Sequence, residues 1–311
     1  MSMRALMGVR ALICAVGFCA AQLAAAMQAP PRASNAPDTP GTGPFAAMKE
    51  EIPALPRNVV YRPADLGSLG AQKLGVVVWG NGGCSNDAAS TRFHLLELAS
   101  HGYLVIAAGR ILSGPGAPAS TGERAAFPPT VPEDLLAGID WALAENQRVG
   151  SAYFGRIDPA QVAVSGFSCG GLQAILVAAD PRVRTALLHN TGTFEGEREA
   201  MPGFKVPKDS LKRFHTPVLY VIGGPTDIAY VNAMDDFRLI DHVPVAIANL
   251  PVGHGGTYSE PNGGAAAQVA VDWLNWQLRG DAKAAARFVG EKCGLCTDSK
   301  WTLERKNFPA R

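Results

Sequence analysis

The chain has 311 residues, a formal net charge of +1, and 47% hydrophobic against 18% charged residues. This length and apolar content suit one large domain or two medium ones with a substantial buried core, and they exclude collagen-like, fibrous and wholly disordered proteins. Because the charge is nearly balanced, the chain offers no long-range attraction to nucleic acid or to an anionic membrane, and neither is expected as a partner.

The N-terminus has the pattern of a secretory signal. Arg4 and Arg10 precede an apolar run at 11–21, small residues follow it, and no acidic residue occurs before Asp38. A positive start, a short apolar middle and an Ala-x-Ala site are typical of export signals. The apolar stretch is shorter than the roughly 20 residues that span a bilayer, which argues against a membrane anchor. We therefore predict that residues 1–26 are a cleaved signal peptide and that the mature protein is exported, either periplasmic or secreted.

Cleavage after residue 26 changes the composition of the mature molecule. It removes 26 of the 311 residues, including two of the 28 basic and none of the 27 acidic ones, and leaves 285 residues with a net charge of −1. The next segment, 27–57, contains seven prolines. Because proline interrupts both helices and strands, this segment is predicted to be an extended linker.

The body of the chain alternates apolar strands with helices. Continuous apolar runs predict buried strands at 74–79, 103–108, 161–165, 183–188, 217–222 and 244–250. Helices are predicted from Pro132 onward, over 171–179, and before Gly280, where apolar residues recur on one stripe. This alternation indicates a mostly parallel sheet with helices on both faces. Such sheets place their chemistry in loops at the carboxyl ends of the strands.

The third of these strands is followed by the sequence Gly-Phe-Ser-Cys-Gly at 166–170. G-x-S-x-G at a strand-to-helix junction is typical of a nucleophile elbow, in which a sharp turn exposes the serine hydroxyl near the positive end of the helix. Without the flanking strand and helix the motif is a weak signal, and a structural glycine turn is the alternative interpretation. In this context Ser168 is predicted to be a nucleophile.

A serine nucleophile needs a base, and the base needs an orienting acid, in the chain order Ser, acid, His. His254 lies in a glycine loop directly after the strand at 244–250, and Asp227 lies in a glycine loop after the strand at 217–222. Both loops follow the carboxyl ends of strands, so we predict His254 as the base and Asp227 as its partner. The rival histidines, His215 and His242, precede strands. The rival acids, Asp235, Asp236 and Asp241, suit a solvated helix face.

Acyl transfer also needs backbone amides aimed at the developing oxyanion. One is expected to be the amide of Cys169, directly after the serine, and the other should come from the glycine loop at 80–84, with Gly83 and Cys84 as candidates. That loop does not match the dinucleotide-binding pattern, because Ser85 stands where the pattern requires glycine.

The order Gly-Asn-Gly-Gly-Cys, Gly-Phe-Ser-Cys-Gly-Gly, Gly-Gly-Pro-Thr-Asp and Gly-His-Gly resembles the α/β-hydrolases from about residue 59 to residue 289. Leu-Ala-Ser-His-Gly-Tyr at 98–103 and Arg-Ile-Asp-Pro at 156–159 are similar to the dienelactone hydrolase, cutinase and polyester hydrolase branch. The resemblance implies one α/β-hydrolase domain at 58–289, without a large cap domain or a cofactor, and a C-terminal tail at 290–311. It implies an acyl-serine intermediate. Cutinases usually carry an aromatic residue in place of Cys84 and histidine in place of Phe167.

Four cysteines remain after signal cleavage, in a compartment where disulfides persist. Cys84 and Cys169 flank the expected oxyanion site and are predicted either to form a disulfide that clamps it or to be two buried small side chains. Cys293 and Cys296 form a C-x-x-C sequence in the tail. Without a thioredoxin-like context, this favours a local disulfide over a redox site, and too few ligands lie nearby for zinc.

The sequence limits the class of substrate but does not name the substrate. Segments 110–130 and 191–216 are long enough to form walls, and aromatic or apolar residues next to the chemical groups suit an acyl pocket, although each suits the core equally well. These candidates are Trp79, Phe167, Ile228, Tyr230 and Tyr258. We predict an exported serine carboxylesterase that needs no metal and acts on small-molecule or polymeric esters. A peptidase or amidase on the same fold and a non-catalytic binding module are the alternatives, and the oligomeric state is left open.

Overall fold

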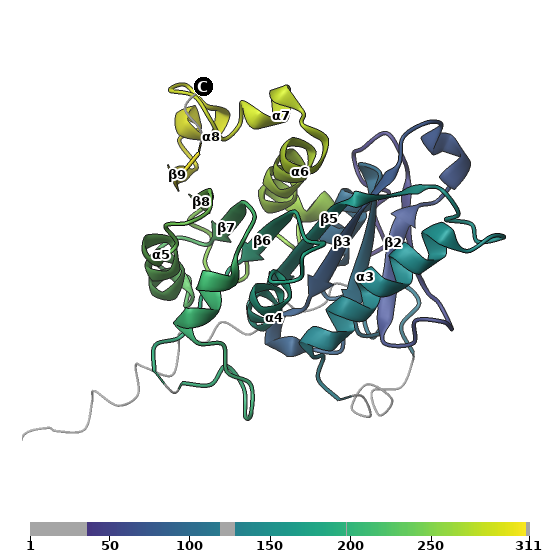
Figure 1. The fold of residues 1–311 in the computed structure, drawn as a ribbon, viewed down its shortest axis with the longest axis horizontal. Helices are drawn as coiled ribbons and strands as arrows, with labels where there is room; N and C mark the ends of the chain where they lie inside the picture. The colour runs from purple at the N-terminus through teal and green to yellow at the C-terminus, as the bar shows by residue number, and fades with distance from the viewer. Residues whose placement is uncertain (1–35, 119–127, 197, 309–311) are drawn as a thin grey trace, which may run out of the picture.

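The computed structural model of the protein describes residues 36–118, 128–196 and 198–308. Within these residues, nine strands form one sheet in the order β1-β2-β4-β3-β5-β6-β7-β8-β9 (Figure 1). The predicted signal peptide, 1–26, lies outside the described residues. None of the helices in the described ranges is long and apolar enough to cross a membrane.

The six central strands are parallel, and each coincides with one of the predicted apolar runs. They are β4 (Tyr103–Ala108), β3 (Leu74–Gly80), β5 (Ile157–Phe167), β6 (Thr185–His189), β7 (Val218–Ile222) and β8 (Val245–Asn249). Every residue of β3 and of β4 is buried, because helices cover both faces of the sheet. The structure is therefore of the α/β class that the sequence predicted.

Helices cover the two faces in separate groups (Figure 1). One face carries α3 (Pro132–Gln147), α4 (Cys169–Val177) and α5 (Tyr230–Leu239), which pack into a first apolar cluster. The other carries α1 (Arg92–Ser100) and α6 (Gly264–Arg279), which pack into a second. As predicted, α3 starts at a proline with acids in its first turn, and α6 stops at Gly280, which takes the left-handed conformation. Short 3-10 helices lie at Leu66–Leu69, Gly82–Cys84, Lys208–Arg213 and Pro261–Gly263.

Both edges of the sheet are antiparallel and correct the predicted domain limits. The described part of the segment 27–57 is not only a linker, because β1 (Ala47–Glu51) pairs with β2 (Asn58–Pro63) at one edge. The segment 290–311 is not a separate tail, because β9 (Thr302–Lys306) pairs with β8 at the other edge, after the short helices α7 (Ala282–Ala285) and α8 (Gly294–Thr297). Edge strands are half solvated and lack the continuous apolar run that marks a central strand.

A buried carboxylate fastens the N-terminal segment to the body. The side chain of Glu97 on α1 is fully buried and accepts hydrogen bonds from the Thr42 amide (2.8 Å) and hydroxyl, and from Gln268 Nε2 on α6 (2.8 Å). His101 Nε2 lies 3.1 Å away. Burial disfavours the charged form, but the bonds from His101, Thr42 and Gln268 outweigh it and lower the pKa of Glu97 to about 2.

This depressed pKa predicts an acid-dependent contribution of Glu97 to stability. The contribution is fully present above the ordinary pKa of about 4.5 and is lost as the pH falls through the folded value near 2. Glu97→Gln should lower the free energy of unfolding at pH 7 by about 2 kcal/mol and flatten its dependence on pH between these values. Urea unfolding as a function of pH measures both effects. The exposed Glu291→Gln is the control, and an unchanged acid slope in Glu97→Gln would contradict the prediction.

Candidate active site

Ser168 stands at the turn between β5 and α4 in a strained conformation. Its backbone has φ 53° and ψ −120°, which residues with side chains rarely adopt. The turn is tight enough that a Cβ on Gly166 would lie 2.3 Å from the Gly170 carbonyl oxygen, and a Cβ on Gly170 would lie 2.0 Å from the carbonyl carbon of Gly80. The glycines of the G-x-S-x-G motif therefore let β3, β5 and α4 meet directly beneath the serine.

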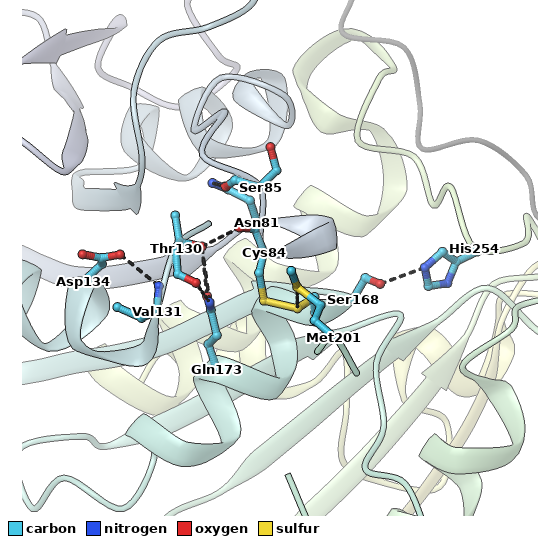
Figure 2. The surroundings of a disulfide bond; sticks show 11 residues. Asn81, Cys84, Ser85, Thr130, Val131, Asp134, Ser168, Gln173, Met201 and His254 are labelled. Atoms are coloured by element: carbon cyan, nitrogen blue, oxygen red, sulfur yellow. Dashed lines mark hydrogen bonds between the residues drawn. A yellow bond between two sulfur atoms is a disulfide. The ribbon is translucent and has the colours of Figure 1, made fainter. Parts of the chain in front are cut away.

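The structure brings Ser168, His254 and Asp227 into one hydrogen-bonded array. His254 Nε2 lies 3.0 Å from Ser168 Oγ, and His254 Nδ1 lies 2.6 Å from Asp227 Oδ1 (the first contact is drawn in Figure 2). The three residues come from loops after β5, β8 and β7, at the carboxyl edge of the sheet where the sequence predicted them. In this geometry the imidazole can accept the serine proton while the carboxylate holds its other ring nitrogen.

Asp227 is held as an anion. Its side chain is fully buried. Oδ2 accepts from the Gly223 amide (2.9 Å) and from Asn190 Nδ2 (2.7 Å), and Oδ1 accepts from the Ala229 amide (2.9 Å). Burial alone would raise the pKa of Asp227, but the hydrogen bonds from His254 and the two amides outweigh it and lower the pKa below its ordinary value.

Asn190 and Tyr258 hold Asp227 in place through a chain of hydrogen bonds. Sequence reasoning missed Asn190, whose only signal was an asparagine directly after an apolar strand; its φ of 46° is left-handed, which asparagine tolerates well. Tyr258 was a candidate either for the substrate pocket or for the core; it is buried, and its hydroxyl donates to Asn190 Oδ1 at 2.5 Å. Burial raises the pKa of Tyr258 well above its ordinary value, so it remains a neutral donor. Tyr258 thus positions Asn190, which positions Asp227.

Removal of the Tyr258 hydroxyl should therefore reduce turnover without altering the cleft wall. Tyr258→Phe loses one hydrogen bond to Asn190, and for the ester hydrolysis that the sequence predicts we expect kcat to fall about tenfold with KM unchanged, as for the loss of one such bond. Tyr61→Phe is a matched control, since that buried hydroxyl donates to the Ala88 carbonyl at 2.8 Å. Steady-state kinetics of both variants decide the matter; equal kcat values in the two would rule out the positioning role.

Two of the three predicted oxyanion donors are available. In the described part of the chain, the amides of Gly83 and Cys169 have no hydrogen-bond partner, and both residues line the same cleft as Ser168. The Cys84 amide instead donates to the Asn81 carbonyl at 3.1 Å inside the turn, so of the two candidates in this loop Gly83 is the one whose amide is available among the described residues. Gly83 has a φ of 64°, and glycine is the residue that takes this value without strain.

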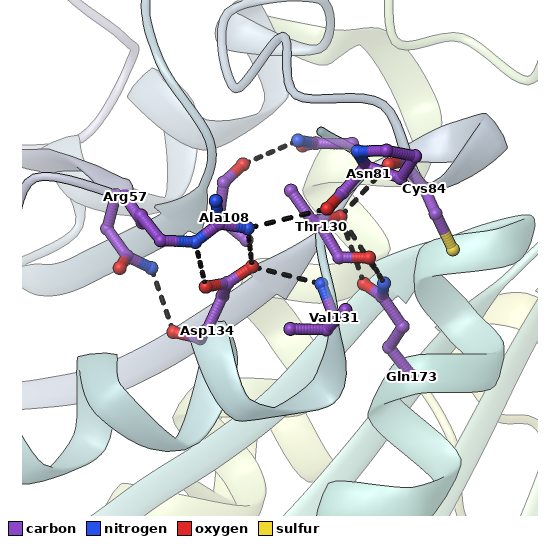
Figure 3. A network of polar contacts seen from close by, with 10 residues as sticks. Arg57, Asn81, Cys84, Ala108, Thr130, Val131, Asp134 and Gln173 are labelled. Atoms are coloured by element: carbon purple, nitrogen blue, oxygen red, sulfur yellow. Dashed lines mark hydrogen bonds and ion pairs between the residues drawn. The ribbon is translucent and has the colours of Figure 1, made fainter. Parts of the chain in front are cut away.

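The loop carrying Gly83 is tied to α4 in two ways. The Cys84–Cys169 disulfide is present, with Cα atoms 5.1 Å apart (Figure 2). In addition, the Cys84 carbonyl accepts from the Thr130 amide at 2.9 Å, and Gln173 Nε2 on α4 donates to the Thr130 carbonyl at 2.6 Å (Figure 3). The disulfide, one of the two alternatives for this cysteine pair, is therefore supplemented by hydrogen bonds that run from Cys84 through Thr130 to Gln173.

The hydrogen-bond network around Cys84 extends to Asn81, Asp134 and Arg57 (Figure 3). Asn81 Nδ2 donates to the Ala108 carbonyl at the end of β4 (2.6 Å), which fixes the start of the oxyanion loop. At the start of α3, Asp134 accepts from the Val131 amide at 2.9 Å and pairs with Arg57 at 2.6 Å. These hydrogen bonds connect the loop to the sheet through Asn81 and to α3 through Asp134, so the loop is held by rigid elements of the fold.

A cleft of about 250 Å³ opens beside Ser168. Its apolar lining includes Leu172, Phe194, Met201 and Ile228. Of the predicted walls, segment 191–216 contributes lining residues, whereas the described part of segment 110–130 contributes none. Of the predicted substrate residues, Ile228 lines the cleft.

The other predicted substrate residues do not line the cleft. Trp79 and Phe167 are buried in the layer beneath α1 and α6, and Tyr230 is half-buried against the opposite cluster. The Phe167 ring nevertheless packs against the His254 ring, with centroids 5.3 Å apart, and so helps to hold His254 in place. Trp79 follows the alternation of β3, which directs its side chain to the face covered by α1 and α6.

Two further histidines are buried in the core. His94 and His189 are fully buried, with ring centroids 5.0 Å apart. Burial lowers the pKa of His94 to about 3 and that of His189 well below its ordinary value, so both are neutral and neither rivals His254 as the candidate base. In the portion of the chain described, no group of three or more His, Cys, Asp or Glu side chains is arranged to hold a metal ion.

Comparison with known proteins adds no assignment. No family model matches the chain, and none of the curated proteins matches it. Its function must therefore be argued from the geometry of the site.

Proposed function

We propose that the protein is an exported serine hydrolase with an α/β-hydrolase fold that cleaves carboxylic esters through an acyl-serine intermediate. The observation that carries the proposal is the array of Ser168 Oγ, His254 and buried Asp227, with contacts of 3.0 and 2.6 Å, at a strained strand-to-helix turn. Two disulfides support export, because such bonds persist in oxidising compartments.

In the proposed reaction, His254 Nε2 takes the proton of Ser168 Oγ as the oxygen attacks the ester carbonyl. The negative charge that develops on the carbonyl oxygen is received by the amides of Cys169 and Gly83. The imidazolium, stabilised by ionised Asp227, returns its proton to the leaving alkoxide and leaves an acyl-serine. A water molecule, deprotonated by His254, then attacks the acyl group by the reverse sequence and releases the acid.

An ester series with a matched amide series tests this function. The enzyme is assayed with 4-nitrophenyl esters of increasing acyl length and with the corresponding 4-nitroanilides. Because the cleft is small and mostly apolar, we expect short and medium esters to be hydrolysed and anilides of the same acyl group to react far more slowly. Comparable rates on both series would favour an amidase, and no turnover of any ester would contradict the proposal.

A further inference from the structure

The second disulfide joins Cys293 and Cys296 around α8, with Cα atoms 5.0 Å apart. Its two sulfurs have different environments. Cys293 is buried, whereas Cys296 is exposed to solvent. An incoming thiolate therefore has access to Cys296 and not to Cys293, so attack at Cys296 Sγ would make Cys293 the leaving sulfur.

The leaving sulfur has donors already in place. Arg305 Nη1 on β9 lies 3.3 Å from Cys293 Sγ and 3.3 Å from Cys296 Sγ. The Cys296 amide lies 3.1 Å from Cys293 Sγ. A guanidinium bond to a thiolate is charge-assisted and therefore stronger than its bond to the neutral disulfide. These contacts stabilise the product of attack more than the starting disulfide.

Arg305 is held in place by two carbonyls, and among the described residues no carboxylate pairs with it. Its guanidinium donates to the Phe288 carbonyl and, at 2.9 Å, to the Gly290 carbonyl, which hold it over the sulfurs. Within the described ranges, no carboxylate forms an ion pair with it. Its positive charge is therefore available to a thiolate at Cys293.

We propose that Cys293–Cys296 is a thiol-exchange site for small thiols. The thiolate RS⁻ forms a bond to Cys296 Sγ while the Cys293–Cys296 bond breaks, and Cys293 leaves as a thiolate beside Arg305. A second thiol molecule, as its thiolate, then attacks the sulfur of RS that is bound to Cys296, giving RSSR and the Cys296 thiolate. Two electrons pass from the two thiols to the cysteine pair, and solvent protons complete the dithiol.

The Cys84–Cys169 disulfide provides an internal comparison. Both of its cysteines are buried, and Met201 Sδ lies 3.4 Å from Cys169 Sγ. No cation contacts these sulfurs in the described part of the molecule. It should therefore resist a thiol that opens Cys293–Cys296.

The experiment follows both disulfides in the same oxidised, full-length protein. The protein is incubated with excess reduced glutathione, samples are quenched with iodoacetamide, and peptide mass spectrometry measures alkylation of each cysteine with time. We expect the 293–296 pair to open at least about tenfold faster than the 84–169 pair, with the transient glutathione adduct on Cys296. Equal rates for the two pairs, or an adduct on Cys293 alone, would overturn the proposal.

The role of Arg305 is tested by a matched pair of charge removals on β9. Arg305→Met should slow opening of the 293–296 pair about tenfold, whereas Lys306→Met, which removes a cation paired with Asp241, should leave the rate unchanged. Arg305→Lys keeps the charge and should restore most of the rate. If Arg305→Met opened as fast as the wild type or faster, the role given to Arg305 would be wrong. The adduct position is read in the wild type, so it does not depend on how any variant folds.

Discussion

Replacing Ser168 with alanine should lower kcat for a short-chain ester by about 10⁶-fold, to the level left by binding and the oxyanion amides alone. The reason is that in the proposed mechanism Oγ forms the acyl bond, and His254 Nε2 lies 3.0 Å from it. Alanine keeps the Cβ at this turn, so the backbone strain at φ 53° is unchanged. Stopped-flow or steady-state assays, with circular dichroism and thermal melting as checks of the fold, measure the effect.

Ser165→Ala is the matched control for this substitution. Ser165 lies three positions earlier on β5, and its hydroxyl donates to the Leu187 carbonyl at 2.9 Å, away from the array. We expect kcat of this variant to stay within about threefold of the wild type, since one neutral hydrogen bond outside the site is lost. A Ser168→Ala enzyme that turned over at the same rate as Ser165→Ala would show that another residue is the nucleophile.

Asp227→Asn should lower kcat by about 10⁴-fold. The wild-type carboxylate accepts from His254 Nδ1 at 2.6 Å, and this bond places the free lone pair on Nε2, towards Ser168. An asparagine side chain has nearly the same shape but carries no charge to stabilise the imidazolium and can present an N–H to Nδ1, which favours the wrong tautomer. Because the pKa of Asp227 is lowered in the folded protein, the loss should be complete at neutral pH, where the wild-type carboxylate is ionised.

The control for this prediction is Asp241→Asn. Asp241 was a rival for the same role, but its exposed side chain pairs with Lys306 at 2.6 Å at the edge of the sheet. Its replacement should leave kcat unchanged, because an exposed ion pair contributes little. Kinetics of both variants over a range of pH separate the two candidates. A large loss in Asp241→Asn together with near-normal activity in Asp227→Asn would reverse the assignment.

The central strands and the triad were predictable for related physical reasons. A strand buried on both faces must be apolar throughout, so β3 and β4 appear in the sequence as continuous runs. Loops after parallel strands meet at one edge of the sheet, so Ser168, Asp227 and His254 could be brought together from their order along the chain. The close approach of the same loops made a Cys84–Cys169 disulfide one of two alternatives, the other being two buried thiols, and the structure contains the disulfide.

The edge strands could not be found in this way. β1 and β9 are half solvated and carry mixed charged residues, so neither has the apolar signal of a central strand. Their pairing depends on where the sheet has a free edge, which is a property of the whole fold. The predicted limits at 57 and 290 therefore separated segments that the sheet includes.

The direction of a side chain was the second source of error. Trp79 and Tyr258 stand next to loops of the candidate site in the sequence, yet both are directed into the layer beneath α1 and α6. Asn190 has no sequence motif, and its role follows from the three-dimensional position of its amide beside Asp227. Cys84 was one of the two candidate oxyanion donors in its loop, but its amide forms a hydrogen bond inside a turn. The local sequence does not reveal that hydrogen bond.

The most direct test of the proposed function is covalent trapping at the nucleophile. The oxidised wild-type protein is treated with a fluorophosphonate, digested and analysed by peptide mass spectrometry, with Ser168→Ala and Ser165→Ala treated in parallel. We predict one phosphonyl group per chain, on Ser168, in the wild type and in Ser165→Ala, and none in Ser168→Ala. A wild-type protein that stays unlabelled, or that carries its label on another residue, would contradict the assignment of Ser168 as an activated nucleophile.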